Sequence, residues 1–335
     1  MHVEDLHGDQ RVRTAVVGAG AIGALLAVAL ARAGQHVSVL ARGATLAAIK
    51  EHGIRIVADD ASAGVVRVEA SHDAAALGEQ DVVVLALKSQ ALPDVAASLR
   101  PLIGPATVVV SAMNGLPWWF LHGLSAPGCA EPLEAVDPGG RVSSVLPAER
   151  AIGCVVHLSS AAEAPGIVKR GRGNRLIVGA AQAECGEAAR TFADALTAGG
   201  FDVESTGDIR TDIWAKLWGN MNMNPLSALT GSTADRLLDD PFTHALVLRM
   251  MEEADAIGRR LGLSTGMSAP DRVAVTRQLG AFKTSMLQDM EAGRALEIDP
   301  ILGVFPELGR RLGVPTPFCD AVLGLLRQRA ANSER

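Results

Sequence analysis

Polar residues with helical spacing interrupt an otherwise apolar stretch, WAKLWGNMNMNPLSALTG at residues 214–231. Lys216, Asn220 and Asn224 are each four residues apart, and at about 3.6 residues per turn each step rotates the side chain by only about 40°. Asn222 falls on nearly the opposite face. The common interpretation of such a stripe is a solvated helix face, but the bordering Trp214 and Trp218 argue against wide exposure and favour one wall of a pocket.

The scarcity of lysine supports this interpretation. The sequence has 31 lysines and arginines together, of which only five are lysines: Lys50, Lys88, Lys169, Lys216 and Lys283. Where arginine is the usual cation, a lysine can mark a place that needs a compact group able to give up a proton.

A second candidate site is the glycine pattern GAGAIG at residues 18–23. The motif follows an apolar run typical of a strand and opens a helical stretch, the setting of a dinucleotide fingerprint. Gly18 would permit the tight turn, Gly20 would let the backbone approach a pyrophosphate, and Gly23 would let helix and strand pack closely. The predicted cofactor contacts are Gly18, Ala19, Gly20, Ala21, Ile22 and Gly23.

The end of the second expected strand indicates which dinucleotide fits. NAD sites usually carry Asp or Glu there, whereas this chain has VLARG, with Arg42 and no acid before Glu51. A guanidinium suits the 2′-phosphate of NADP, although a solvated surface arginine is the alternative.

Two further polar residues end expected strands, Lys88 after VVVLALK and Asn114 after VVVSAMN. Ligands of open parallel sheets lie beyond the carboxyl ends of the strands. We therefore expect Lys88 to contact the cofactor phosphate or ribose and Asn114 the nicotinamide or substrate, while strand-ending polar residues without a ligand are the alternative.

These groups require a particular scaffold. Apolar runs at 13–18, 36–41, 81–88 and 106–115 alternate with helical stretches that end near Gly34, Gly53 and Gly104, which predicts a Rossmann-like, doubly wound parallel α/β sheet. Shorter strands after residue 150 (151–160, 166–171 and 175–180) would extend the same sheet in antiparallel fashion.

Helical periodicity dominates after residue 208, so we expect an NADP-binding domain at 1–208 and an all-helical substrate and dimerisation domain at 209–335. Single helices are expected within 212–231, 241–262, 269–293, 300–313 and 320–331.

Composition excludes several functional classes. The net charge of −6 and the lack of a basic tract argue against nucleic acid, and the apolar stretch 15–31 is too short and too glycine-rich for a membrane span. The four cysteines form no CxxC pair, so neither a metal site nor a disulfide framework is expected. With no secretory signal at the N-terminus, a cytoplasmic location fits best.

The motifs together resemble the 2-dehydropantoate 2-reductase (ketopantoate reductase) family. The resemblance rests on the glycine turn, Lys88, MNG at 113–115, KLWGNMNMNPLSALTG, SMLQDMEAG and LEIDPILG, and it spans about residues 12–328. It implies NADPH-dependent reduction of a 2-oxo acid to a 2-hydroxy acid, a step of pantothenate biosynthesis, by a Rossmann domain joined to a helical domain. A homodimer is a further expectation from the family.

Site roles follow from the resemblance. Lys216 would be the catalytic general acid, and Glu297 the acidic partner that tunes or positions the lysine and contacts the ligands. Asn114, Asn220 and Asn224 would orient the substrate, and Ser285 would bind its carboxylate. A helix N-terminal carboxylate and a helix-surface hydroxyl are the alternatives for Glu297 and Ser285.

The chain departs from the family pattern at three places. Phe282 replaces the asparagine three residues before the carboxylate-binding serine, Leu302-Gly303 replaces the usual Asn-Gly pair, and Trp118-Trp119-Phe120 follows Asn114. Either the substrate is more hydrophobic than ketopantoate, or the aromatic residues pack beneath the sheet edge. Two other functions stay open: a related hydroxy-acid or amino-acid-derivative dehydrogenase, and a non-catalytic NADP-binding redox sensor.

Overall fold

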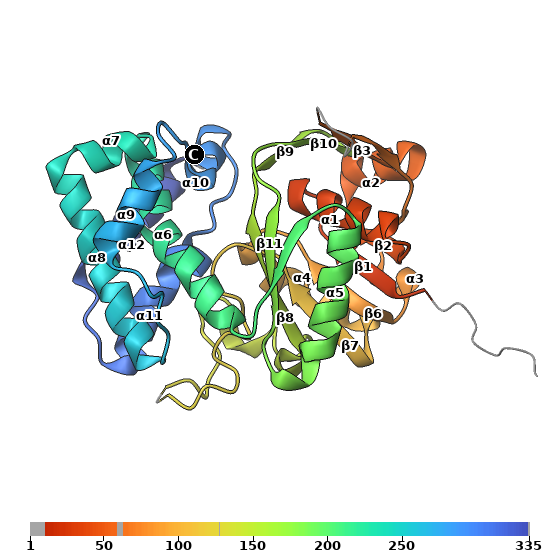
Figure 1. Ribbon diagram of the computed structural model, residues 1–335, viewed down its shortest axis with the longest axis horizontal. Coiled ribbons are helices and arrows are strands. Elements are labelled where there is room, and N and C mark those ends of the chain that lie inside the picture. Colours follow the sequence, from red (N-terminus) through yellow and green to blue (C-terminus); the bar gives the residue numbers. More distant parts are fainter. Residues whose placement is uncertain (1–10, 59–62, 127, 334–335) are drawn as a thin grey trace, which may run out of the picture. The chain divides into compact units, whose positions relative to one another are not determined.

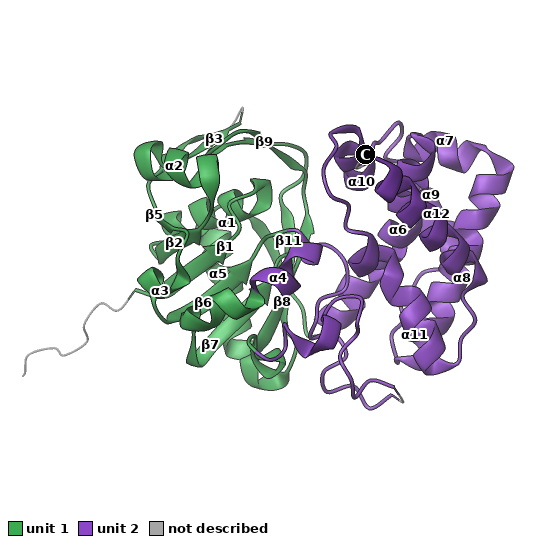
Figure 2. Cartoon of the chain, turned by 180° about the vertical axis from the view of Figure 1, so that it is seen from behind, with its two compact units in different colours: residues 1–87, 96–112, 145–207 green, residues 88–95, 113–144, 208–335 purple. Residues whose placement is uncertain are grey.

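The computed structural model describes residues 11–58, 63–126 and 128–333. The chain folds as two compact units (Figure 2). Unit 1 comprises residues 1–87, 96–112 and 145–207, and unit 2 comprises residues 88–95, 113–144 and 208–335. The helical part begins at Asp208, near the predicted boundary, but unit 2 also takes two segments from the N-terminal half of the chain.

Unit 1 is built on an eight-stranded sheet with the order β12-β11-β8-β7-β6-β1-β2-β5 (Figure 1). All neighbouring pairs are parallel except β11 with β8. The strand bounds are β1 (Arg13–Val17), β2 (His36–Leu40), β5 (Glu69–Ser71), β6 (Gln80–Leu85), β7 (Ile103–Ser111), β8 (Ala151–His157), β11 (Arg175–Ala180) and β12 (Asp202–Ser205).

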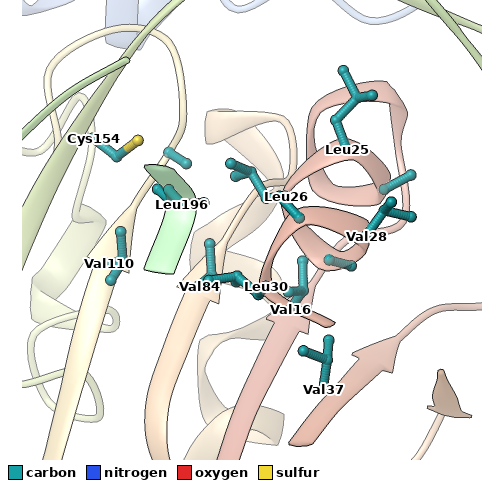
Figure 3. Packing of buried hydrophobic residues seen from close by; sticks show 14 of the residues in the cluster. Val16, Leu25, Leu26, Val28, Leu30, Val37, Val84, Val110, Cys154 and Leu196 are labelled. Carbon is teal, nitrogen blue, oxygen red and sulfur yellow. The ribbon is translucent and has the colours of Figure 1, made fainter. Parts of the chain in front are cut away.

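The continuous apolar strands form the core of unit 1, as their composition predicts. Val16 and Val84 on neighbouring strands pack with Leu26 and Leu30 of α1 (Ala21–Arg32) and Leu196 of α5 (Gly186–Ala198) in one cluster (Figure 3). Because residues on both faces of these strands are buried, alternation is absent from their sequences. The predicted α/β class with a parallel sheet is confirmed.

Several local predictions for unit 1 are wrong. Residues Ile167–Arg170 (β10) do not extend the main sheet but join a separate sheet of order β4-β3-β10-β9, formed with β3 (Ile54–Val57), β4 (Gly64–Val66) and β9 (Ser160–Ala164). Gly104 lies inside β7 rather than ending a helix. The short strands β3, β4, β5 and β12 and the helices α3 (Ala74–Leu77) and α5 were not predicted, whereas α2 (Gly43–His52) was.

The expected helix before β7 is broken into short pieces. A 3₁₀ turn at Ser89–Ala91 leads into α4 (Leu92–Val95), and a second 3₁₀ segment covers Ala96–Leu102. Pro101 lies inside that segment, where its ring cannot donate the hydrogen bond that a regular helix requires.

Unit 2 is dominated by helices, with α6 packed against α8, α10 and α12. The bounds are α6 (Ile209–Thr230), α7 (Ala234–Asp239), α8 (Pro241–Arg260), α9 (Ala269–Arg277), α10 (Ser285–Glu291), a π turn at Asp299–Gly303, α11 (Val304–Leu312) and α12 (Pro317–Ser333). Among the described residues no helix is both long and apolar enough to cross a membrane.

The single helix predicted within 269–293 is in fact two, α9 and α10. Gly280 adopts a φ of 64°, which ends the helical path. The Thr284 hydroxyl then accepts a hydrogen bond from the Leu287 backbone N–H and caps the new helix.

Candidate functional site

The glycine turn of unit 1 is shaped by close backbone contacts. A Cβ added at Gly18 would lie 2.8 Å from the Ala86 carbonyl oxygen. A Cβ added at Gly23 would lie 1.9 Å from the Gly18 carbonyl oxygen. The Gly18 N–H also donates to the carbonyl of Leu40, which ties the turn to the end of β2. These two glycines are therefore required by packing.

Gly20 differs from the other two glycines because a Cβ there would meet no protein atom within 4 Å. Gly20 is the N-cap residue of α1 and provides no side-chain cap, so the first N–H groups of the helix are available to an anion. Ala19, Ala21 and Ile22 are half-buried and pack against the core. The turn thus fits the pyrophosphate of a dinucleotide, whose contacts would come from backbone N–H groups.

Arg42 lies two residues after the end of β2 and is the exposed N-cap residue of α2. In the described part of the chain its guanidinium forms no ion pair with a carboxylate. A free guanidinium two residues beyond the strand that binds the glycine turn suits the adenosine 2′-phosphate of NADP.

In unit 2, the Lys216 Nζ donates a hydrogen bond to Asn114 Oδ1 at 3.0 Å. The backbone holds Asn114 in place: Gly115 has a φ of 83°, a Cβ there would lie 2.6 Å from the Pro300 carbonyl oxygen, and the Leu116 N–H donates to that oxygen. The fold therefore brings together two predicted site residues that are far apart in the sequence.

Lys88 and Glu297 form a second pair of predicted residues that the fold joins. Their charged groups lie 3.5 Å apart, and Lys88 forms a closer ion pair with Asp289, which in turn pairs with Arg294 at 2.8 Å. The Lys88 side chain is 42% exposed, whereas both carboxylates are buried. Sequence reasoning missed Asp289, although it lies in the quoted SMLQD string, because nothing in its spacing indicates a partner.

Ser89 connects the two pairs. Its backbone N–H donates to Glu297 Oε1 at 3.0 Å, and its hydroxyl donates to the backbone carbonyl of Asn114. A continuous polar network therefore runs from Asp289 through Lys88, Glu297 and Ser89 to Asn114 and Lys216. The Glu297 carboxylate thus accepts a hydrogen bond from a backbone N–H of a 3₁₀ turn. Its role is therefore not limited to offsetting the dipole of the helical turn that follows it.

The remaining predicted substrate residues lie on α6 and α10. Asn224 is buried and Asn220 half-buried on the Lys216 side of α6. Ser285 is exposed at the first position of α10. The Asn222 amide donates to the Trp218 carbonyl of its own helix, in keeping with the prediction that Asn222 lies away from the stripe.

The tryptophans of this region form a buried core. Trp119 and Phe120 have no exposed surface, and Phe120 stacks on Trp214, whose ring contacts Phe305. Trp218 is also buried and donates its indole N–H to a carbonyl of α8. The residues Trp118-Trp119-Phe120 are buried, but the ring contacts of Phe120 lead to α6 and α11 of unit 2 and not to the sheet edge that we expected. This burial gives no reason to expect a hydrophobic substrate.

Family models match most of the chain. The model of ketopantoate reductase PanE/ApbA covers residues 14–183, and that of the PanE/ApbA C terminal covers residues 208–330. A 2-dehydropantoate 2-reductase from Mesorhizobium japonicum is 42% identical over 320 residues, which are 95% of this chain and 98% of the relative.

Solved structures agree with these matches. A crystal structure from Ralstonia solanacearum MolK2 has a TM-score of 0.90 and 48% identity, covering 96% of this chain and 99% of that one. The 2-dehydropantoate 2-reductase of Geobacter metallireducens GS-15 has a TM-score of 0.81 and 27% identity, covering 95% and 99%. The chain belongs to the ketopantoate reductase family.

Proposed function

We propose that the chain reduces a 2-oxo acid to the 2-hydroxy acid with NADPH, as its family membership implies, and that ketopantoate is the first substrate to test. The chain is then an NADP-dependent oxidoreductase of pantothenate biosynthesis. The observation that supports this proposal most directly is the Lys216–Asn114 hydrogen bond within the polar network of unit 2.

Lys216 is the general acid of the proposed reaction. The bound cofactor supplies the hydride that reduces the carbonyl carbon, and the Lys216 ammonium gives a proton to the carbonyl oxygen, so that the ketone becomes a secondary alcohol. Asn114 accepts one ammonium hydrogen and so helps to position the Lys216 ammonium. A positioned ammonium stabilises the developing alkoxide and completes the proton transfer.

The other residues of the network hold the ligands. Asn220 and Asn224 orient the polar groups of the substrate from the same helix as Lys216, and Ser285 donates a hydroxyl to its carboxylate. Lys88 contacts the cofactor phosphate or ribose, and Glu297 fixes Lys88 through their ion pair. In unit 1, the N–H groups of the glycine turn and Arg42 bind the pyrophosphate and the 2′-phosphate.

A panel of 2-oxo acids tests the proposal, with NADPH consumption followed by its absorbance. We expect ketopantoate or a close analogue to be reduced, and the Lys216→Ala variant to lose about 10²- to 10⁴-fold in kcat with little change in NADPH affinity. Lys169→Ala removes an exposed lysine of β10 and is the matched control, with activity like that of the wild type.

Each alternative function has its own signature in this assay. Binding of NADPH without reduction of any 2-oxo acid would support a redox sensor, and turnover only with other ketones would support a related dehydrogenase. Wild-type turnover by Lys216→Ala would contradict the role of this lysine. A homodimer formed by unit 2 and a cytoplasmic location complete the proposal, and sedimentation and cell fractionation test them.

A further inference from the structure

Helix α9 carries an arginine that packs on a glycine of α6. A Cβ added to Gly219 would lie 2.2 Å from Arg272 Nη2 and 2.7 Å from its Cζ. The guanidinium therefore occupies the space that a side chain at position 219 would need. Gly219 makes room on the helix for one specific charged group.

This guanidinium has no anionic partner among the residues that the structure describes. Its hydrogen bond within the protein runs from Nη1 to the buried Thr276 hydroxyl at 3.0 Å on the same helix. Burial lowers the pKa of Arg272, and no neighbouring carboxylate offsets this effect. Because an arginine has five N–H donors, most of them are left for a ligand.

The position of Gly219 places Arg272 beside the proposed catalytic lysine. Gly219 follows Lys216 by three residues, so it lies about 60° around the helix and about 4.5 Å along it. Lys216, Ala215 and Asn220 around it are half-buried, whereas the opposite side of α6, with Trp214 and Trp218, is buried. The guanidinium thus covers the less buried face of α6, next to Lys216.

We propose that Arg272 binds the carboxylate of the 2-oxo acid substrate, an inference that rests on the proposed function. In a 2-oxo acid the carboxylate is bonded directly to the ketone carbon, so its two recognition groups must be neighbours on the protein. Lys216 meets the ketone oxygen and Arg272 meets the carboxylate, with which a planar guanidinium can form two parallel hydrogen bonds. Ser285 then provides a secondary contact rather than the main one.

The test compares a 2-oxo acid with its uncharged methyl ester. Arg272→Gln is expected to raise KM for the acid about 10- to 100-fold, the loss of one or two hydrogen bonds to a charged group, with KM for NADPH unchanged. The preference of kcat/KM for acid over ester falls by the same factor. Arg272→Lys keeps the positive charge but lacks the planar pair of N–H donors, and it is expected to retain part of that preference.

Two further variants separate binding from packing. Gly219→Ala keeps Arg272, but the added methyl group occupies the space of its guanidinium and must displace it. This variant is expected to reduce the preference for the acid as Arg272→Gln does. Arg277→Gln removes an exposed arginine of α9 that pairs with Asp239, and should leave acid and ester kinetics unchanged. Thermal unfolding of each variant establishes that the protein is folded.

The outcomes distinguish the inference from the function on which it rests. Equal losses with acid and ester would assign Arg272 to packing, and a rise in KM for NADPH alone would assign it to a cofactor phosphate; either result overturns the inference while leaving 2-oxo-acid reduction standing. A wild-type enzyme that reduces no 2-oxo acid would overturn the proposed function itself.

Discussion

Gly20 and Gly23 are three residues apart in the sequence but differ in their surroundings, because a Cβ at Gly20 would face open space and a Cβ at Gly23 would face protein. At Gly20 the backbone has φ −69° and ψ −175°, which alanine also adopts, and an added Cβ meets nothing within 4 Å. We therefore predict that Gly20→Ala impairs cofactor binding without unfolding unit 1.

The expected sizes follow from this geometry. Alanine is a poorer N-cap than glycine by up to about 1 kcal/mol, but it reduces the entropy of the unfolded chain by about 0.4–1 kcal/mol, so the free energy of unfolding hardly changes. The methyl group would occupy the space that we assign to the pyrophosphate. Losing one or two charged hydrogen bonds there weakens NADPH binding by about 10- to 100-fold.

Gly23→Ala should behave in the opposite way. Its Cβ would lie 1.9 Å from the Gly18 carbonyl oxygen, a contact that only movement of α1 away from the turn can relieve. Overpacking of this kind costs about 1–3 kcal/mol or more, and about 2–4 °C of Tm accompanies each kcal/mol in a unit of this size. Gly23→Ala is thus the matched variant whose main expected effect is a lower thermal stability rather than a lower cofactor affinity.

Thermal unfolding and titration of NADPH against protein fluorescence measure the two effects separately. We expect Gly20→Ala to keep the wild-type Tm and lose affinity, and Gly23→Ala to lose Tm even without cofactor. Wild-type NADPH affinity in Gly20→Ala would refute the assignment of this turn to the pyrophosphate. An unchanged Tm in Gly23→Ala would refute the packing argument.

The remaining predictions concern charge, capping and thiols. Arg42→Ala should raise KM for NADPH more than KM for NADH, since only NADPH carries the 2′-phosphate. Equal changes of the two KM values in steady-state assays would contradict the assignment of Arg42 to that phosphate. The buried Glu253 carboxylate accepts two N–H groups in the first turn of α12, so Glu253→Gln should lower the free energy of unfolding in urea by about 1–3 kcal/mol, whereas the exposed Glu252→Gln should change it by less than about 0.5 kcal/mol. All four cysteines are buried, and burial raises the pKa of Cys319, with the Glu253 carboxylate adding to the rise, so the thiolate fraction at neutral pH is reduced. A thiol reagent should therefore label the native protein slowly and all four thiols after denaturation, and rapid native labelling would contradict the described burial.

The sequence predicted those elements that a strong local pattern of apolar residues defines. The apolar strands around Val16 and Val84 and the long helix α6 follow directly from composition and periodicity. The failures lie where tertiary context decides. The strand at Ile167–Arg170 is only four residues long, and its pairing with β3 and β9 in the folded chain is what assigns it to another sheet.

The site could be predicted in part for a similar reason. Helical spacing identified the stripe on α6, and motif resemblance brought in Glu297, but neither indicates the contacts that connect distant segments. The Lys88–Asp289 and Lys216–Asn114 pairs join residues 201 and 102 positions apart, and such pairings follow from the folded topology alone. Arg272 has no motif at all, and only its contact with Gly219 singled it out.

The discontinuous composition of unit 2 limits how this enzyme can be recombined with its relatives. Lys88 and Asn114 belong to segments 88–95 and 113–144, which lie before the helical half in the sequence but fold with it. A chimera joined once at residue 208 would combine Lys216, Asp289 and Glu297 of one parent with the network partners of another. A graft that keeps the network together must transfer three stretches of chain, so exchange of substrate preference between family members requires five crossovers rather than one.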